Sequence, residues 1–305
     1  MDDKNYQYLE AIKTKRRYED ILLLKKGVVG CGVGLDKQGK LGIVVYSAGE
    51  AHAIPSKLDD INVFIEEVKP DEKWTKEGHI TAASRQDLEK VTREETLTKL
   101  HSPNKVDAAV GKPNSLDLVV PEILGLGIPK GIRQAYPGMQ VRKSGRTTGV
   151  TDGIVLACDI SFLVNYSSMG YGTALFVEQI ATTPMSESGD SGSLTVDTDL
   201  YAIGLLFAQT TTFTLHNSIQ NVLNALNIEI WADRVTPEWR KKIAEINREY
   251  RNGKERTERW RPVPMGVSIG HYKGGTGTAG CLVKHKRTGE ILILSNAHVS
   301  AMPIR

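Results

Sequence analysis

A short serine-containing segment is the first candidate for chemistry: residues 188–193 read SGDSGS. A serine hydroxyl is a weak nucleophile, so it needs a neighbouring base and N–H donors for the negative charge that develops on the attacked carbonyl oxygen. Glycines on both sides of Ser191 allow a tight turn, and we predict that the N–H groups of Gly189 and Ser191 form an oxyanion hole. Apolar residues at 194–196 and 202–207 predict a buried hairpin directly after this turn. A surface turn without chemistry is the alternative interpretation.

A histidine at the end of a strand pattern is the second candidate. Residues 291–299 read ILILSNAHV, an apolar run followed by a polar corner that contains His298. Histidine suits the role of general base because it titrates near neutral pH and a neighbour can hold it in one tautomer. His271 also follows a predicted strand, but the remaining histidines occupy no similar context. A histidine that only satisfies hydrogen bonds in the core is the alternative interpretation.

An aspartate between apolar residues is the third candidate. Asp107 lies in the segment NKVDAAV at 104–110, which reads as the start of a strand. We expect its carboxylate to be buried, and a buried carboxylate needs a hydrogen-bond partner. The N–H group of a histidine would be one such partner, as in the Ser-His-Asp arrangement. Asp117 is a weaker candidate because it lies in a polar turn, and a turn-capping role for Asp107 is the alternative.

Taken together, three short motifs resemble those of a known family. Residues 189–192 (GDSG), 295–299 (SNAHV) and 106–109 (VDAA) look like the three triad motifs of trypsin/chymotrypsin-like serine peptidases. They are most similar to bacterial members related to the plant Nal1-type trypsin-like proteases. Further similar segments are 137–149, 183–193, 204–208 and 266–283, and residues 28–68 resemble the small domain that precedes the peptidase in that group.

The resemblance implies a mainly β fold, namely a trypsin-like double β-barrel preceded by a small α/β domain. It also implies a serine endopeptidase in which Asp107 orients His298, His298 takes the proton of Ser191, and Ser191 forms an acyl-enzyme with a protein or peptide substrate. The specificity pocket would be formed by Met185 at its base and by Leu206, Phe207 and Ala208 on its wall. These apolar side chains favour a small or apolar residue on the acyl side of the cleaved bond.

The order of the motifs differs from that of the family, in which the histidine comes first. Here the order is Asp107, Ser191 and His298, which indicates a circularly permuted or rearranged peptidase. The region 71–105 takes the place of strands that the family has between its histidine and its aspartate, but it reads as helical. The lobe with the histidine is therefore expected to be permuted or incomplete. A catalytically impaired, peptidase-like binding protein is the alternative function, and an esterase is disfavoured because no Gly-x-Ser-x-Gly elbow is present.

The predicted elements divide the chain into five regions. Residues 1–70 form a small α/β unit, and 71–105 form a polar connector with a helix at 84–100. Short apolar runs about ten residues apart, a pattern typical of a β-barrel or sandwich, continue from 106 to 235 and include Asp107 and Ser191. A helix and linker follow at 236–261, and a β segment with His298 occupies 262–305.

The composition is that of an ordinary globular protein, with 40% hydrophobic and 25% charged residues in a chain of 305. A net charge of +3 does not indicate nucleic-acid binding. No apolar run reaches the length of a membrane span and no signal peptide is visible, so we expect no membrane association and a cytoplasmic location. Three widely spaced cysteines (Cys31, Cys158 and Cys281) predict free thiols, and we expect neither a metal nor a cofactor. The oligomeric state is left open.

Overall fold

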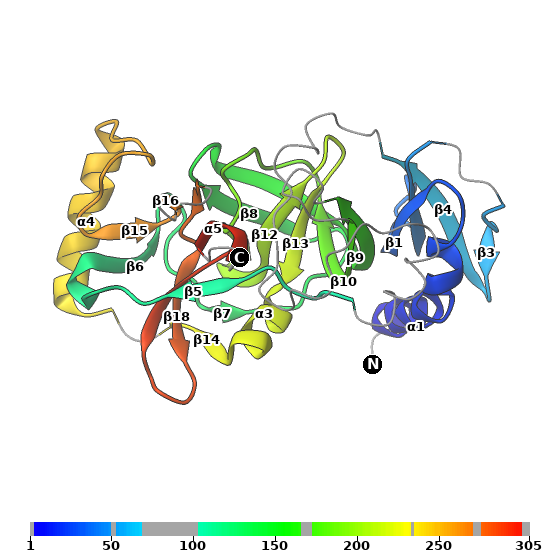
Figure 1. Ribbon diagram of the computed structural model, residues 1–305, viewed down its shortest axis with the longest axis horizontal. Helices are drawn as coiled ribbons and strands as arrows, with labels where there is room; N and C mark the ends of the chain where they lie inside the picture. Colours follow the sequence, from blue (N-terminus) through cyan, green and yellow to red (C-terminus); the bar gives the residue numbers. More distant parts are fainter. Residues whose placement is uncertain are drawn as a thin grey trace.

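The computed structural model describes residues 3–49, 53–68, 103–165, 173–232, 235–270 and 276–300. Across these ranges the protein is mainly β, with helix α4 (Pro237–Arg251) at one end of its longest axis and helix α1 (Asp3–Leu23) towards the other (Figure 1). The helix predicted at 84–100 falls outside the described residues. Among the helices within them, none combines the length and the apolar character needed to cross a membrane.

Six strands close into a barrel. They pair in the order β10–β13–β12–β11–β8–β9, and β9 pairs in turn with β10, so the ring has no open edge. The hairpin predicted after the serine turn is present as the antiparallel pair β11–β12. The barrel strands are β8 (Gln140–Gly145), β9 (Gly149–Asn165), β10 (Thr173–Thr182), β11 (Leu194–Asp197), β12 (Tyr201–Gln209) and β13 (Thr214–Ser218), with β7 (Gly131–Ile132) beside β12.

The N-terminal strands continue the barrel sheet, because β1 pairs with β9. The glycines of β1 explain this close pairing: a Cβ on Gly30 would lie 2.8 Å from the Ser161 carbonyl oxygen, so a larger residue would push β9 away. Helix α1 packs against β1 and β2 (Figure 1). The elements of this unit are α1 (Asp3–Leu23), β1 (Val28–Leu35), β2 (Leu41–Ser47), β3 (Lys57–Leu58) and β4 (Ile61–Glu67). The glycine-rich strand β1 is therefore largely buried.

A separate four-stranded sheet has the order β14–β18–β19–β5. Its strands come from distant parts of the chain: β5 pairs antiparallel with β19, with Ala109 opposite Ser295. The sheet shares a hydrophobic core with the barrel, in which Leu194 of β11 packs in the same cluster as Leu294 of β19. The strands outside the barrel are β5 (Ala109–Gly111), β14 (Ile228–Ile230), β18 (Cys281–His285) and β19 (Ile291–Ser295), and the short pairs β6 (Val119–Ile123) with β15 (Val263–Met265) and β16 (Ser268–Gly270) with β17 (Thr276–Thr278).

The helix and linker predicted at 236–261 are both packed onto the β structure. Thr236 caps the helix by accepting a hydrogen bond from the Trp239 N–H group. In the linker, the buried Arg256 guanidinium donates to the Ser144 hydroxyl and to the Gly266 carbonyl oxygen, at 2.7 and 2.9 Å. The linker is thus fixed to β8. The remaining helices are η2 (Leu116–Leu118), α3 (Ile219–Leu226), α4 (Pro237–Arg251) and α5 (Ala297–Ser300).

One histidine, His216, lies fully inside the barrel, and its burial makes the stability of the folded protein sensitive to acid. Both ring nitrogens of His216 lie 2.9 Å from a hydroxyl oxygen, those of Thr182 and Thr195. Burial, with a smaller contribution from the Lys143 charge, lowers the pKa of His216 from 6.5 to about 3. In the unfolded chain this histidine binds a proton below pH 6.5, whereas the folded protein keeps it neutral down to about pH 3. Stability that is present above pH 6.5 is therefore lost as the pH falls towards 3.

We expect the free energy of unfolding of the wild type to fall by about 3 kcal/mol between pH 6.5 and pH 4 through His216 alone. His216→Gln should be less stable at pH 7, since it loses one of two buried hydrogen bonds, but its stability should fall less steeply with pH. Urea unfolding at the two pH values measures both quantities, with His285→Gln at the half-buried end of β18 as the matched control. Equal slopes for His216→Gln and the wild type would show that another group is responsible.

Candidate active site

Asp107 and His298, 191 positions apart in the chain, are in direct contact. The Nδ1 atom of His298 lies 2.7 Å from Oδ2 of Asp107, and the two side chains are 2% and 1% exposed. The other carboxylate oxygen, Oδ1, accepts hydrogen bonds from the N–H groups of Ala297 at 3.0 Å and His298 at 3.4 Å. A carboxylate can only accept, so Nδ1 carries the proton of this pair and the imidazole lone pair is placed on Nε2.

Two asparagines hold the backbone of Asp107 in place. The Asp107 N–H group donates to Oδ1 of Asn217 at 2.9 Å, and Nδ2 of Asn296 donates to the Asp107 carbonyl oxygen at 2.6 Å. Asn217 in turn donates to Oε1 of Gln179 at 2.7 Å. All of these side chains are buried, so the carboxylate is fixed by β10, β13 and the turn after β19 together.

Ser191 lies half-buried in a tight loop between β10 and β11. Gly189 and Gly192 have φ values of +95° and +93°, a backbone region that glycine adopts without steric cost. The loop is closed by hydrogen bonds from Asp190 N–H to the Glu187 carbonyl oxygen and from Ser193 N–H to the Asp190 carbonyl oxygen, both 3.0 Å long. Within the described residues, the N–H groups of Gly189 and Ser191 donate to no protein acceptor, whereas that of Gly192 donates to β12.

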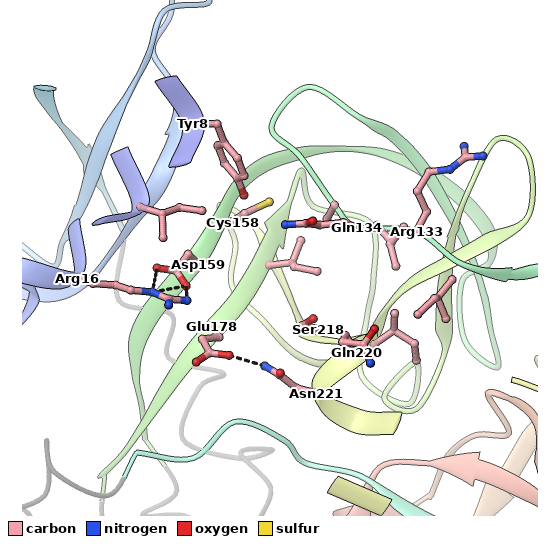
Figure 2. A pocket seen from close by; sticks show the side chains of 16 residues that line it. Tyr8, Arg16, Arg133, Gln134, Cys158, Asp159, Glu178, Ser218, Gln220 and Asn221 are labelled. Atoms are coloured by element: carbon pink, nitrogen blue, oxygen red, sulfur yellow. Dashed lines mark hydrogen bonds and ion pairs between the residues drawn. The ribbon is translucent and has the colours of Figure 1, made fainter. Parts of the chain in front are cut away.

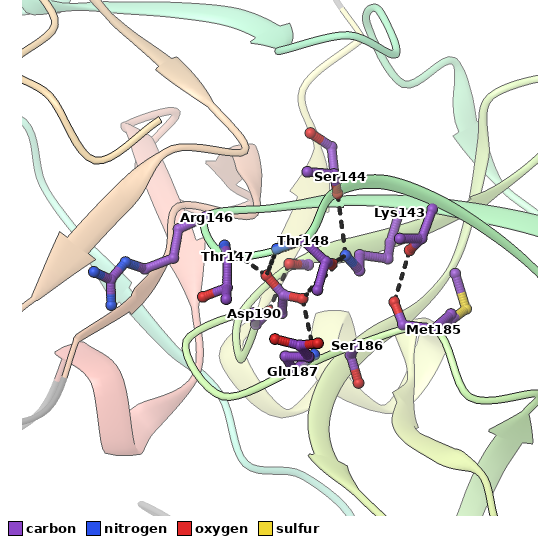
Figure 3. Close-up of polar contacts among 12 residues, drawn as sticks. Lys143, Ser144, Arg146, Thr147, Thr148, Met185, Ser186, Glu187 and Asp190 are labelled. Carbon is purple, nitrogen blue, oxygen red and sulfur yellow. Dashed lines mark hydrogen bonds and ion pairs between the residues drawn. The ribbon is translucent and has the colours of Figure 1, made fainter. Parts of the chain in front are cut away.

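A buried ion pair between Lys143 of β8 and Asp190 holds this loop against the barrel. Nζ of Lys143 lies 3.1 Å from Oδ2 of Asp190, and neither side chain is exposed (Figure 3). Burial raises the pKa of Asp190, but the Lys143 charge and hydrogen bonds from Thr148 and from the Glu187 and Thr147 N–H groups outweigh it, so the pKa is lowered. Asp190 therefore remains a carboxylate, and removing either ion would leave the other buried and unpaired, a change that costs about 3–5 kcal/mol in typical proteins.

Strand β17 lies between the loop that contains Ser191 and the turn that contains His298. The Thr278 N–H group donates to the Ser191 carbonyl oxygen at 2.8 Å. Its neighbour Gly277 has no side chain, and a Cβ there would meet the Ser191 carbonyl oxygen at 2.7 Å and a methyl group of Val299 at 2.8 Å. Ser191 and the residue that follows His298 thus lie against the same glycine. The structure thus places Asp107 and His298 in contact and the Ser191 loop beside the strand that borders the residue after His298.

The residues predicted to form a specificity pocket are packed in hydrophobic cores. Met185 is 4% exposed and clusters with Val155 and Ile180, while Phe207 is 3% exposed and stacks on Phe176 with ring centroids 5.0 Å apart. Leu206 is also buried, and Ala208 is half-buried. None of the four lines either of the hollows found among the described residues, so their role in substrate selection stays a prediction.

The largest of these hollows lies elsewhere, between helix α1 and the barrel (Figure 2). Its volume is about 340 Å³, and its charged lining groups have partners: Arg16 contacts Asp159, and Glu178 accepts a hydrogen bond from Asn221. Arg133 pairs with Asp197 and Asp199, which lie outside the lining. Tyr8 and the buried Cys158 also line it. Neither Ser191 nor His298 does, so this hollow is separate from the candidate active site.

The other sequence candidates lie outside this site. The Asp117 side chain is 80% exposed and lies 3.7 Å from Lys242, which removes it as a rival to Asp107. All three cysteines are buried, and burial raises the pKa of each thiol to about 12, so none is a thiolate at neutral pH. His271 falls outside the described residues, within which no group of three or more metal-ligating side chains occurs.

Several positioning residues carried no sequence signal. Lys143 lies in a strand whose neighbours are polar and apolar in alternation, and nothing local indicates that it pairs with Asp190. The same is true of Asn217, which lies more than a hundred residues from Asp107. Asn296 was the one residue with a usable signal, since a polar corner directly after an apolar strand indicates side chains that bond a neighbouring backbone.

No family model and no curated protein matches this chain. Among solved structures, a glutamic acid-specific serine protease that uses a histidine triad in substrate binding is 26% identical, with a TM-score of 0.28; the match covers 34% of this chain and 54% of that one. A chymotrypsin from Cellulomonas bogoriensis is 25% identical with a TM-score of 0.27, over 33% of this chain and 52% of the other. The chain thus spans about half the length of these serine proteases. The assignment of a function depends on the geometry around Asp107, Ser191 and His298.

Proposed function

We propose that this protein is a serine endopeptidase of the trypsin-like class, with Ser191 as nucleophile, His298 as general base and Asp107 as the residue that orients the histidine. The observation that carries the proposal is the buried carboxylate of Asp107, which bonds Nδ1 of His298 and two N–H groups of the same turn. A carboxylate that accepts a hydrogen bond from Nδ1 of a histidine in this manner fixes both the tautomer and the plane of the ring.

In the proposed reaction, Nε2 of His298 takes the Ser191 proton while the serine oxygen attacks a peptide carbonyl. The negative charge that develops on the carbonyl oxygen is met by the Gly189 and Ser191 N–H groups, for which the loop provides no acceptor of its own among the described residues. His298 then gives its proton to the departing amine, which leaves an acyl-enzyme on Ser191. A water molecule, deprotonated by His298, releases the acid and restores the hydroxyl.

The proposed architecture is a trypsin-like double β-barrel whose lobes follow in permuted order. Support comes from the division of the described strands: the closed ring of six carries Ser191, and the separate sheet with β5 and β19 carries Asp107 and His298. The helix α4 and the packed linker with Arg256 connect the two parts along the chain. The proposed substrate is a protein or peptide with a small or apolar residue before the cleaved bond, because the four residues predicted to select it are apolar.

Covalent labelling with a fluorophosphonate tests the proposal. These probes react with a serine that is activated by a histidine, so we expect one probe per chain, attached to Ser191 in the peptide map. The exposed Ser188, three residues away, serves as an internal comparison for unspecific reaction. Denatured protein should not react. If the native protein also fails to react, or reacts at a different serine, the non-catalytic binding protein becomes the better interpretation.

A further inference from the structure

Arg146 lies directly beside the proposed oxyanion hole. A Cβ on Gly189 would be 3.2 Å from Nη1 of Arg146, so the guanidinium packs against the glycine whose N–H group faces the substrate. Nη1 donates to the Thr276 hydroxyl at 2.7 Å, and the Arg146 backbone N–H donates to the Thr278 hydroxyl at 3.0 Å. Figure 3 shows the side chain extending away from the Lys143–Asp190 pair, and it reaches β17.

The charge of Arg146 is not neutralised by any carboxylate within 4 Å among the described residues. By contrast, the buried ammonium groups of Lys15 and Lys143 each contact an acid. In addition, Nε of Arg146 is buried and donates no hydrogen bond to the described part of the chain. Because Nε has no exposed surface, a ligand can reach only the terminal nitrogens of this half-buried side chain.

The position of β17 shows which part of a substrate would meet this arginine. Strand β17 lies between the Ser191 loop and α5, since Thr278 bonds Ser191 and Gly277 contacts Val299. The departing amine must be within reach of His298 on α5, so the peptide segment after the cleaved bond lies on this side of Ser191.

We propose that Arg146 binds the carboxylate of an acidic side chain in the first two residues after the cleaved bond, so that the enzyme prefers substrates with Asp or Glu there. This inference rests on the proposed peptidase function and adds a specificity-determining residue to it. Guanidinium and carboxylate groups form charge-assisted hydrogen bonds, and the terminal nitrogens of Arg146 are the donors that such a carboxylate would reach.

Matched internally quenched peptides test this preference. There are two series of three peptides. In one series the first residue after the cleaved bond is Glu, Gln or Lys, and in the other series the second residue is. All peptides carry the same equimolar mixture of Ala, Val and Leu before the cleaved bond. In one of the two series we expect kcat/KM of the wild type, normalised to active sites titrated with a fluorophosphonate, to be about tenfold higher for Glu than for Gln. Lys should be the poorest.

Three variants assign the preference to Arg146. Arg146→Gln should bring the Glu/Gln ratio to about one, Arg146→Lys should keep part of it, and Arg146→Glu should favour the Lys peptide, because the sign of the charge is reversed. Arg142→Gln removes a half-buried arginine of β8 that lies four residues before Arg146 and pairs with Asp152, and it should keep the wild-type ratio.

The outcomes separate this inference from the function on which it rests. If the wild type is labelled at Ser191 and cleaves peptides, but its Glu/Gln ratio is one or is unchanged in Arg146→Gln, the acidic subsite is wrong and the peptidase function stands. If neither labelling nor cleavage occurs, both proposals are wrong.

Discussion

Ser191→Ala is expected to abolish peptide hydrolysis while the protein remains folded. The hydroxyl oxygen forms the bond to the acyl group, and alanine has no atom that can replace it. Only the N–H donors and substrate binding would then remain, and in comparable enzymes these supply about 10³–10⁴-fold acceleration over water. The side chain is small and half-buried on a glycine turn, so its removal should barely change the packing.

The measurement is kcat on the best internally quenched peptide, together with the thermal unfolding midpoint. Ser188→Ala is the matched control, because it removes an exposed hydroxyl from the same loop and should leave kcat unchanged. A Ser191→Ala variant that keeps activity within a factor of two of the wild type, at an unchanged midpoint, would show that Ser191 is not the nucleophile.

Asp107→Asn should lower kcat by about 10⁴, the size of the effect known for the orienting aspartate of Ser-His-Asp enzymes. The physical reason lies in the hydrogen bonds around this side chain. The Ala297 and His298 N–H groups both require an acceptor, so the amide oxygen of the asparagine would face them. Its NH₂ group would then donate to Nδ1 of His298, which places the ring proton on Nε2 and removes the base.

The prediction is specific to kcat, because substrate binding does not involve Asp107. Steady-state kinetics should therefore show a large fall in kcat with a small change in KM, and fluorophosphonate labelling of Ser191 should slow in parallel. Asp117→Asn, at an exposed position, is the matched control. Equal activities of Asp107→Asn and the wild type would mean that the contact between Asp107 and His298 serves only the packing of the two parts.

Local sequence patterns were informative where the backbone itself imposes the structure. The turn around Ser191 needs positive φ angles at Gly189 and Gly192, and only glycine provides them without steric cost. The start of α4 is similarly encoded by Thr236, whose side chain caps the helix, and by the proline that follows it. Apolar runs separated by a turn predicted the paired strands β11 and β12.

The charged partners inside the site could not be predicted in the same way. Lys143 in a strand looks like a surface residue until β8 is placed beside the loop that contains Asp190. Arg146 looks like one residue of a polar turn until β17 is placed against it. Such contacts depend on strand pairing between segments more than a hundred residues apart or on opposite sides of a loop, and no local preference encodes them.

Local sequence patterns singled out three side chains, Asp107, Ser191 and His298, and placed each of them in a turn or at the end of a strand. Their arrangement depends on the tertiary structure: the antiparallel pairing of β5 with β19 brings Asp107 into contact with His298, and β17 lies between the Ser191 loop and Val299. The physical reason is that reactive geometry must be correct to a fraction of an ångström, whereas sequence patterns specify only which face of a strand or which turn a side chain occupies. Only packing of the two parts around one shared core sets the remaining distances.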